Sequence, residues 1–404
     1  MRWKRHCFQI IVIFFALHPF LCRATEWPHW RGPNRNGVIH EMGHAQKPTL
    51  NTIWDTSIGR GYSAFAIADG RAYTMGHDGQ TNETLYCFDA ETGEELWTHT
   101  YPGELIPRMH AGGPNAMPSI VGQRLYTVSK DGQLFCYKAA DGTQLWRTSL
   151  VNDLGFKLPT FGFASAPLVV NGELVMHGGQ TFALDPDTGS LLWKSEFDYI
   201  ASYVTPVRFE TGDSDVIATL YGNRVVVLDP KGVELASQPF YAKHDTTATT
   251  PVLLDAADGT FFVSANEGGR AVQYVNGGLK TLWEASDMKN EMNASVLVDG
   301  HLYGFSGRHD SRTAALTCIR ADDGKLLWSE TGMGCGSLIA NGKRLLVLSE
   351  SGEVVVAEAS PDAFRPVARK QILEKRCWTP PSLSDGKLYI RNEQGRLACV
   401  SLRE

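Results

Sequence analysis

Short apolar segments of strand length alternate with turns rich in glycine and aspartate along most of the chain. In residues 122–137, for example, a glycine turn precedes Leu-Tyr-Thr-Val, and an Asp-Gly turn separates it from a second apolar segment. Of the 404 residues, 40 are glycine, 10% are aromatic and only 20% are charged. This composition favours many short strands joined by tight turns and disfavours a helical or disordered protein.

A longer unit repeats within this pattern and ends in Asp-x-x-Thr-Gly-x-x-x-Trp or a close variant. Aligning the last position of each copy, at steps of 43 to 49 residues, gives Trp54, Trp97, Trp146, Trp193, a degenerate Ser237, Trp283, Trp328 and an eroded position near Glu374. A four-stranded antiparallel blade needs about that many residues, so the period predicts a β-propeller. Within each unit, Asp is expected to bond the turn backbone, Gly to adopt a positive φ, and Trp to dock between neighbouring blades.

The two ends of the chain add up to one further blade. After the last repeat only three strands remain, at 381–383, 387–391 and 396–402, and the first tryptophan lies on a lone strand at 50–56. Pairing this N-terminal strand with the C-terminal three would close the ring and leave no open sheet edge. The expected fold is therefore an all-β, eight-bladed propeller of four-stranded antiparallel blades, forming a single domain over residues 50–404.

These repeats resemble the PQQ-like (pyrroloquinoline quinone) repeats of quinoprotein alcohol dehydrogenases and of the outer-membrane assembly lipoprotein that shares their fold. The likeness covers nearly all of residues 50–402. In addition, Trp-Pro-x-Trp-Arg-Gly-Pro-Asn-Arg-x-Gly at 27–37 resembles an N-terminal signature of exported PQQ-like propellers common in planctomycete-type bacteria. The resemblance implies a fold and an export route, and it implies no particular reaction.

The first 24 residues are typical of a signal peptide. Three basic residues lie within the first five, an apolar run follows at 8–17, and Cys22-Arg23-Ala24 offers small residues at a cleavage site. A lipoprotein anchored at Cys22 is the alternative, although Leu21 stands where a small residue is wanted. Removing residues 1–24 moves the formal charge from −6 to −10, because four cationic residues are lost. An exported, acidic protein of the periplasm, cell envelope or extracellular space is expected, with no nucleic-acid partner.

A quinoprotein dehydrogenase of the founding type would need features that are absent from the sequence. No adjacent cysteine pair exists, and no Cys-x-x-Cys-His motif could attach a haem. Such enzymes hold calcium with several oxygen ligands. The nearest match to such a ligand cluster is Asn290, Glu291 and Asn293, and a solvated loop explains these polar residues equally well. No cofactor is expected, and PQQ with calcium is kept as the alternative.

His40-Glu41-Met42-Gly43-His44 matches the zinc-protease pattern His-Glu-x-x-His. That chemistry requires a helix with both histidines on one face, whereas Gly43 and Pro48 make a helix improbable. A surface loop is therefore expected, and no metal site. No Gly-x-Ser-x-Gly elbow or phosphate-cradling loop is present either.

The cysteines fall into two groups. Cys87, Cys136, Cys318 and Cys399 share one slot on the third strand of their blades, where a small buried filler is expected. Cys335 and Cys377 instead precede the inner strands of adjacent blades. We hypothesise that they meet at the channel and form a disulfide in an oxidising compartment.

A ligand would be met by the loops that enter the inner strands, because these converge around the axis on one face. Their polar and aromatic residues are Arg60, Tyr62, Arg108, His110, Asn115, Phe161, Phe163, Tyr199, Tyr203, His244, Asp245, Asn290, Asn293, Arg376 and Trp378. Such residues could bind a ligand, or they could only plug the channel. Arg108, His110, Arg376 and Trp378 are the preferred contacts, since cationic and aromatic groups together suit an anionic or planar ligand.

Three functions remain open. The favoured one is a monomeric, non-catalytic binding or scaffold propeller of the periplasm or cell envelope, whose ligand is a protein, peptide or glycan. The second is a PQQ-dependent oxidoreductase acting on alcohols or sugars. The third is an assembly factor for outer-membrane proteins, like the lipoprotein relative.

Overall fold

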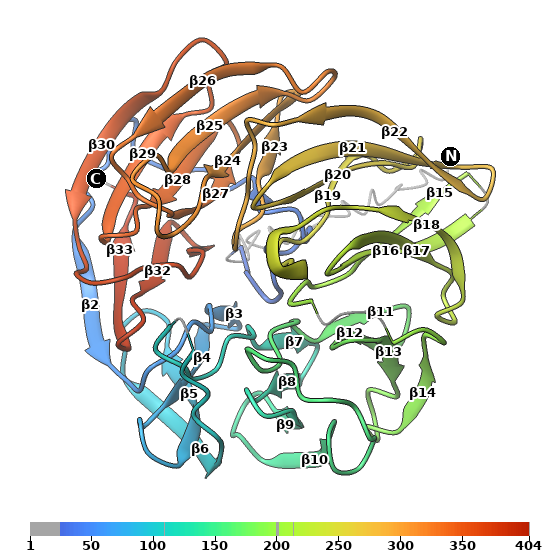
Figure 1. The fold of residues 1–404 in the computed structure, drawn as a ribbon. Helices are drawn as coiled ribbons and strands as arrows, with labels where there is room; N and C mark the ends of the chain where they lie inside the picture. The colour runs from blue at the N-terminus through green and yellow to red at the C-terminus, as the bar shows by residue number, and fades with distance from the viewer. Residues whose placement is uncertain (1–24, 109, 199–201, 213, 404) are drawn as a thin grey trace, which may run out of the picture.

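The computed structural model describes residues 25–403, apart from 109, 199–201 and 213. Eight antiparallel sheets stand around a central axis in chain order (Figure 1), which confirms the predicted eight-bladed propeller. The predicted signal peptide and Tyr199 lie outside the described residues. Within them, the single helix is the short 3₁₀ turn η1 (Lys243–Asp245), and no helix has the length and hydropathy of a membrane-spanning segment.

The blades are numbered in chain order, and the strands of each are given from the axis outward. Blade 1 consists of β3 (Ala66–Ala68), β4 (Arg71–His77), β5 (Asn82–Asp89) and β6 (Glu95–Pro102), and blade 2 of β7 (Ser119–Val121), β8 (Arg124–Val128), β9 (Gln133–Lys138) and β10 (Gln144–Ser149). Blade 3 consists of β11 (Leu168–Val170), β12 (Glu173–His177), β13 (Thr181–Leu184) and β14 (Leu191–Lys194), and blade 4 of β15 (Val207–Thr211), β16 (Ser214–Tyr221), β17 (Arg224–Leu228) and β18 (Glu234–Pro239).

Blade 5 consists of β19 (Val252–Asp255), β20 (Thr260–Ala265), β21 (Gly268–Val275) and β22 (Gly278–Ala285), and blade 6 of β23 (Val296–Val298), β24 (His301–Ser306), β25 (Ala315–Arg320) and β26 (Leu326–Thr331). Blade 7 consists of β27 (Ser337–Asn341), β28 (Arg344–Leu348), β29 (Glu353–Glu358) and β30 (Arg365–Gln371), and blade 8 of β31 (Ser382–Ser384), β32 (Lys387–Arg391), β33 (Arg396–Ser401) and β2 (Thr52–Ser57).

The ring closes as the sequence predicted. Strand β2 pairs antiparallel with β33 and becomes the outer strand of blade 8, with Trp54 directly opposite Cys399. A second N-terminal strand, β1 (Val38–Ile39), was not predicted, and it pairs in parallel with β27 as a fifth strand of blade 7. The two N-terminal strands β1 and β2 are therefore held by two different blades.

The repeat motif joins each blade to the next. In the turn before β6, the Asp89 carboxylate accepts hydrogen bonds from the Glu91 and Thr92 amides at 3.0 and 2.8 Å. Gly93 follows with φ +75°, and a Cβ atom on it would lie 2.6 Å from the Trp54 ring of blade 8. The pairs Gly142–Trp97, Gly189–Trp146, Gly232–Trp193 and Gly324–Trp283 repeat this contact from blade to blade. Glycine is thus required both by the turn and by the indole that covers it.

Two of the aligned repeat positions were wrong. In each of the six blades with tryptophan, this residue lies on the outer strand, pairs with the third strand and comes directly after a register shift. Ala236 takes that place in blade 4, opposite Val227, and Ala368 takes it in blade 7, opposite Val356. Ser237 and Glu374 do not hold it, because without the tryptophan the spacing alone could not fix the register. The small-filler prediction is confirmed for Cys87, Cys136, Cys318 and Cys399, which are buried opposite Trp97, Trp146, Trp328 and Trp54.

Candidate functional site

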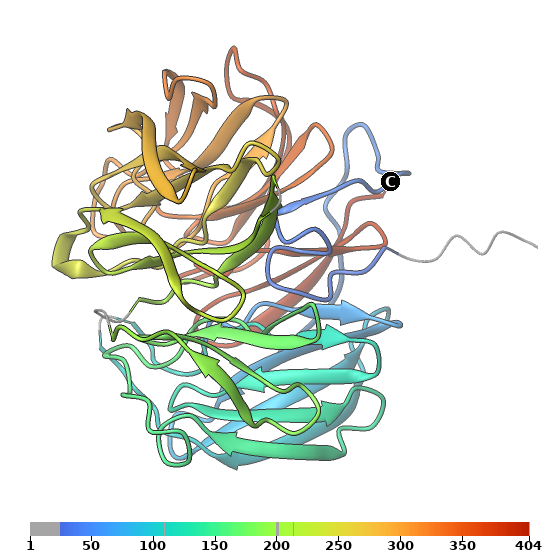
Figure 2. The ribbon, with the colours of Figure 1, turned by 90° about the vertical axis from the view of Figure 1, so that its right-hand side faces the viewer.

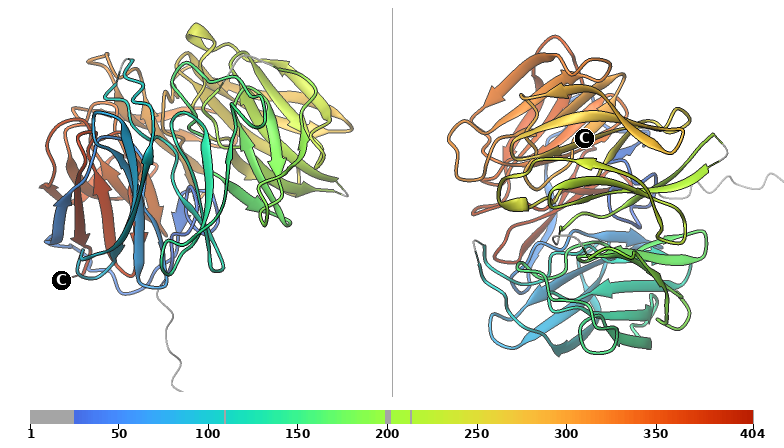
Figure 3. Two further views of the ribbon diagram at one scale, coloured as in Figure 1. Left: turned by 90° about the horizontal axis from the view of Figure 1, so that it is seen from below. Right: turned by 45° about the vertical axis from the view of Figure 1, so that its right-hand side comes forward.

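The two ends of the axis differ. Each inner strand starts from a loop that comes from the outer strand of the preceding blade, and we call the end where these loops gather the mouth. η1 lies at the mouth, and the N-terminal extension (residues 25–49) lies at the opposite end (Figures 2 and 3). The turns between the second and third strands also lie at the mouth, as the up-and-down order of the strands requires.

Six aromatic rings form a continuous row across the mouth. In order they are His309, Trp378, Tyr62, His110, Phe161 and Tyr203, with consecutive ring centroids 5.4, 5.9, 5.5, 5.8 and 5.4 Å apart. Apart from His309, which lies between β24 and β25, each ring comes from a different loop entering an inner strand. The structure therefore brings together Tyr62, His110, Tyr203 and Trp378 of the predicted contacts.

A cluster of charges lies at one end of this row. The Arg376 guanidinium lies over the Trp378 ring, 4.3 Å from its centroid. Its Nη1 is 3.4 Å from Glu393 Oε2, and its Nε is 3.9 Å from Glu350 Oε1. Trp378 Nε1 donates a 3.1 Å hydrogen bond to Glu350, and the Tyr62 hydroxyl donates one of 2.7 Å to Glu393. The arginine, both carboxylates and two rings thus form one connected unit.

Two central rings of the row, His110 and Tyr62, are uncharged at neutral pH. Burial, together with the nearby cations of Lys130 and Arg376, lowers the pKa of His110 to about 3. Burial and the hydrogen bond to Glu393 raise the pKa of Tyr62. The mouth therefore carries a row of aromatic rings bordered on one side by an arginine and two carboxylates.

Several residues of this site were not found from the sequence. Glu350 and Glu393 occupy the same slot in neighbouring blades, in the turns Ser-Glu-Ser-Gly and Asn-Glu-Gln-Gly between the second and third strands. That shared slot was the available signal. Arg391, completely buried, donates to the carbonyls of Gly59, Ser63 and Met75 at 3.3, 3.0 and 2.7 Å. It thereby fixes the loop that carries Tyr62, and no pattern in the repeat marks this role.

The other predicted contacts have different positions. Asn293 is buried and donates to the carbonyls of Gly336 and Trp378 at 3.2 and 2.9 Å, so it holds the loop under the indole. Asn115 donates to the carbonyl of Phe161 at 3.4 Å. Arg60, Arg108 and His244 are exposed. The two asparagines position the aromatic row rather than line its surface.

The nearest match to a calcium site does not fit that ion. The Asn290 amide donates a hydrogen bond to the Phe305 carbonyl and accepts one from the Ser295 hydroxyl, both at 2.9 Å. Glu291 is paired with His309 Nδ1 at 2.9 Å. Across the described residues, no three His, Cys, Asp or Glu side chains converge as metal ligands. Calcium needs several free oxygen ligands together, so these residues do not form a quinone–calcium site.

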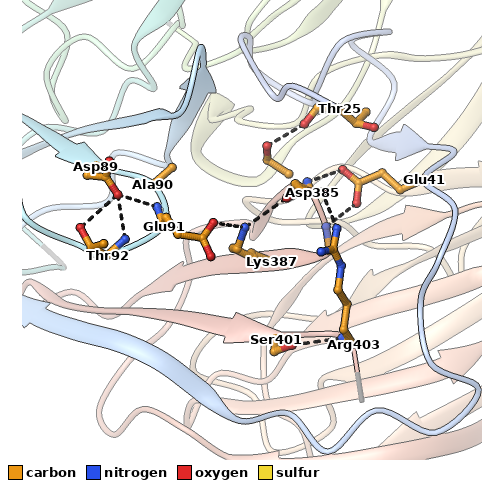
Figure 4. Close-up of polar contacts among 12 residues, drawn as sticks. Thr25, Glu41, Asp89, Ala90, Glu91, Thr92, Asp385, Lys387, Ser401 and Arg403 are labelled. Carbon is orange, nitrogen blue, oxygen red and sulfur yellow. Dashed lines mark hydrogen bonds and ion pairs between the residues drawn. The ribbon is translucent and has the colours of Figure 1, made fainter. Parts of the chain in front are cut away.

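The His-Glu-x-x-His segment is a loop, as predicted. It has no helical structure, and Gly43 has φ +83°. The Glu41 carboxylate accepts hydrogen bonds from the Asp385 and Gly386 amides, both at 2.8 Å (Figure 4), and His44 Nε2 lies 3.2 Å from it. Glu41 therefore caps a turn of blade 8.

Cys335 and Cys377 are buried free thiols, so the structure does not contain the hypothesised disulfide. The Cys377 sulfur contacts the Lys375 carbonyl at 3.5 Å, and that of Cys335 contacts the Gly307 carbonyl at 3.9 Å. Burial raises the pKa of both thiols to about 12.

Two groups of known proteins are prominent among the matches to this chain. A family model described as outer membrane protein assembly factor BamB matches residues 81–330. The BamB of Yersinia pestis is 22% identical over 358 residues, covering 81% of this chain and 82% of its own. The quinoprotein ethanol dehydrogenase of Pseudomonas aeruginosa is 27% identical over 235 residues, covering 49% of this chain and 36% of its own. The solved quinohemoprotein alcohol dehydrogenase of Comamonas testosteroni superposes with a TM-score of 0.71 at 12% identity, over 94% of this chain and 80% of its own.

Proposed function

Because the chain belongs to the PQQ-like repeat β-propeller family, we propose that it is an exported, non-catalytic scaffold of the cell envelope that binds a protein segment across the mouth. The observation that carries this proposal is the continuous row of six rings, built from loops of different blades. Rigid aromatic side chains contribute large contact areas at small entropic cost and dominate protein interfaces. A row of this kind suits an extended partner.

Exposed apolar side chains on the mouth loops also support the mouth as the binding surface. Leu158, Phe197 and Tyr241 are 41%, 51% and 69% exposed, and they lie on the loops that enter blades 3, 4 and 5, the first two of which also carry Phe161 and Tyr203. Apolar groups gathered on one face commonly mark an interaction site. Arg376, Glu350 and Glu393 at the other end of the row would fix the orientation of a partner through charge.

A second candidate is a role in outer-membrane protein assembly. It is favoured by the family model and by the BamB relatives, which this chain matches over about four fifths of both lengths. Under this candidate the segment bound at the mouth belongs to a component of the assembly machinery or to an outer-membrane protein. The envelope location rests on the predicted signal peptide and on the names of these relatives.

The enzyme alternative has its own test, which is calorimetric titration of PQQ, with and without calcium, into the mature protein. We expect no saturable binding, because the side chains nearest to a calcium site are committed to other partners. Saturable micromolar binding that is lost in an Arg376→Ala, Trp378→Ala double variant would overturn the scaffold proposal in favour of a quinone enzyme.

The scaffold proposal is tested by quantitative co-purification from detergent-extracted envelopes. The mature chain is compared with an Arg376→Ala, Tyr241→Ser variant and with an Arg147→Ala variant, whose changed residue is exposed on β10 away from the mouth. A specific partner should be recovered with the wild type and the control, and at least tenfold less with the mouth variant. Equal recovery with all three chains contradicts the proposal. The identity of the recovered partner decides between a general scaffold and an assembly factor.

A further inference from the structure

The signature at 27–37 lies at the end of the axis away from the mouth, and the proposed function does not use it. On one side it is bonded to the first three blades. Trp27 exchanges backbone hydrogen bonds of 3.0 and 2.9 Å with Ile67 of β3, and the Pro28 carbonyl accepts one of 2.9 Å from the amide of Ile120 on β7. Arg35 Nη2 donates a 3.0 Å hydrogen bond to the Val169 carbonyl of β11.

On the other side the same segment is bonded to blades 5 and 6. Trp30 Nε1 donates a 2.8 Å hydrogen bond to the Thr250 hydroxyl, just before β19. The buried Arg31 side chain donates to the carbonyls of Ala294 and Ser295, just before β23, at 3.3 and 2.6 Å. Its Nη2 also donates to the Asn36 carbonyl at 2.7 Å, which holds the segment in its bend.

The following residues reach blades 7 and 8. The Gly37 carbonyl accepts a 2.8 Å hydrogen bond from the amide of Ala340, where β1 pairs with β27. Figure 4 shows Glu41 over the turn of Asp385, next to Thr25, whose carbonyl accepts a 2.6 Å hydrogen bond from Ser384. Among the described residues, hydrogen bonds thus join the segment from Thr25 to Glu41 to every blade except blade 4.

The position of the signature against the inner strands requires its particular residue types. Gly32 and Gly37 have φ +81° and +78°, and a Cβ atom on either would lie 2.8 Å from the Trp27 ring or from Val296. Trp27 is 2% exposed and Arg31 is 8% exposed, although an arginine is rarely buried without such a set of acceptors. A small cavity above them is lined by Arg31 and Trp30 and by Met117 and Leu338 of the inner-strand region.

We propose that residues 25–46 are an axial clasp. In a ring of blades each sheet contacts only its two neighbours, so an opening at one boundary is resisted only locally. The clasp joins blades that do not touch, such as blades 2 and 7, and it makes the inner strands open together. It also closes the axis at its own end, so that a partner reaches the axis only through the mouth.

The test is hydrogen exchange on the mature full chain, comparing the wild type with Arg31→Ala and with the control Arg147→Ala. The amides of Ile120 and Ala340 donate to clasp carbonyls, whereas the hydrogen bonds of the Arg31 side chain go to Ala294, Ser295 and Asn36. In Arg31→Ala their exchange should rise at least tenfold, on opposite sides of the ring, and the control should leave it unchanged. A merely local role of Arg31 would change exchange only around β23.

Two results would overturn the clasp. One is exchange of the Ile120 and Ala340 amides in the wild type as fast as that of exposed loops. The other is an effect of Arg31→Ala confined to blade 6. If Arg31→Ala does not fold, Trp30→Phe replaces it, because this variant keeps a ring and loses only the hydrogen bond to Thr250. Its exchange should rise at the same two amides, and a rise limited to the Thr250 region would overturn the proposal equally.

Discussion

The hydroxyl of Tyr62 donates a 2.7 Å hydrogen bond to the carboxylate of Glu393, across the boundary between the last blade and the first. The same carboxylate lies 3.4 Å from Arg376 Nη1, so the aromatic row and the charged cluster meet at the place where the ring closes. The surface proposed to bind a partner is therefore built on the closure itself, and anything that loosens the closure should also disturb the mouth.

Tyr62→Phe is expected to lower the free energy of unfolding by about 1–2 kcal/mol. The change keeps the ring in the row but removes one of the two partners of Glu393 and the acceptor of the Ala111 amide, which lies 3.3 Å from the hydroxyl. Urea unfolding followed by fluorescence measures the difference. Tyr241→Phe, at a side chain that is 69% exposed, is the control and should be neutral. Equal midpoints for Tyr62→Phe and the wild type would show that the bond contributes nothing.

Gly93→Ala is expected to destabilise the protein by about 2–4 kcal/mol, because it adds a left-handed alanine and an overpacked contact. The new Cβ would lie 2.6 Å from the Trp54 ring. Gly70→Ala separates the two costs, since Gly70 has a similar φ of +71° but no atom within 4 Å of an added Cβ. Urea unfolding of both variants should show the smaller loss for Gly70→Ala. Equal losses would mean that the indole contact between blades adds no stability.

The blade repeat and the mouth differ in how far the sequence could predict them. The blade repeat was predictable because its signals are local, with Asp89, Gly93 and Trp97 lying within nine residues of one another. The closure followed from counting strands. The mouth was only partly predictable, since Glu393 and Tyr62 are 331 residues apart and meet only in the folded ring. The buried position of Arg31 could not be predicted either. Its acceptors are the backbone carbonyls of Ala294 and Ser295, and the sequence does not show which carbonyls accept hydrogen bonds.

Glu83 should make the protein less stable as the pH rises from about 5 to 7. Burial raises the pKa of its carboxyl from 4.5 to about 8, although hydrogen bonds from the Lys130 amide and the Tyr101 hydroxyl oppose the shift. In this range the folded chain keeps a proton that the unfolded chain has lost, so the unfolded state gains relative stability with pH. Burial lowers the pKa of the Lys130 amine to about 7, so this amine begins to lose its proton near the upper end of the range and there acts in the opposite direction.

Glu83→Gln keeps the neutral shape of the side chain and removes its proton equilibrium. The difference in unfolding free energy between the wild type and this variant should therefore fall steadily between pH 5 and pH 7. Urea unfolding at several pH values measures it. A difference that rises or stays constant over this range would contradict a buried, protonated Glu83.

Cys335 and Cys377 should resist alkylation in the native protein. Burial raises the pKa of both thiols to about 12, which leaves almost no thiolate at pH 7.5. Iodoacetamide should label both residues in 8 M urea without a reductant, and neither in native buffer over an hour, as read by peptide mass spectrometry. A peptide pair joined through Cys335 and Cys377 in the unreduced protein would restore the disulfide hypothesis.

Binding of a protein segment across the mouth can be tested by site-specific photocrosslinking in the cell envelope. The probe is placed at Tyr241, on a loop at the mouth, and separately at Val233, which is 58% exposed in the turn between β17 and β18 at the other end of the axis. A crosslinked partner is expected from position 241, with a yield reduced at least tenfold when Arg376→Ala is added, and no crosslink is expected from position 233. Crosslinks from position 233 alone, or a yield at position 241 unaffected by Arg376→Ala, would contradict binding across the mouth.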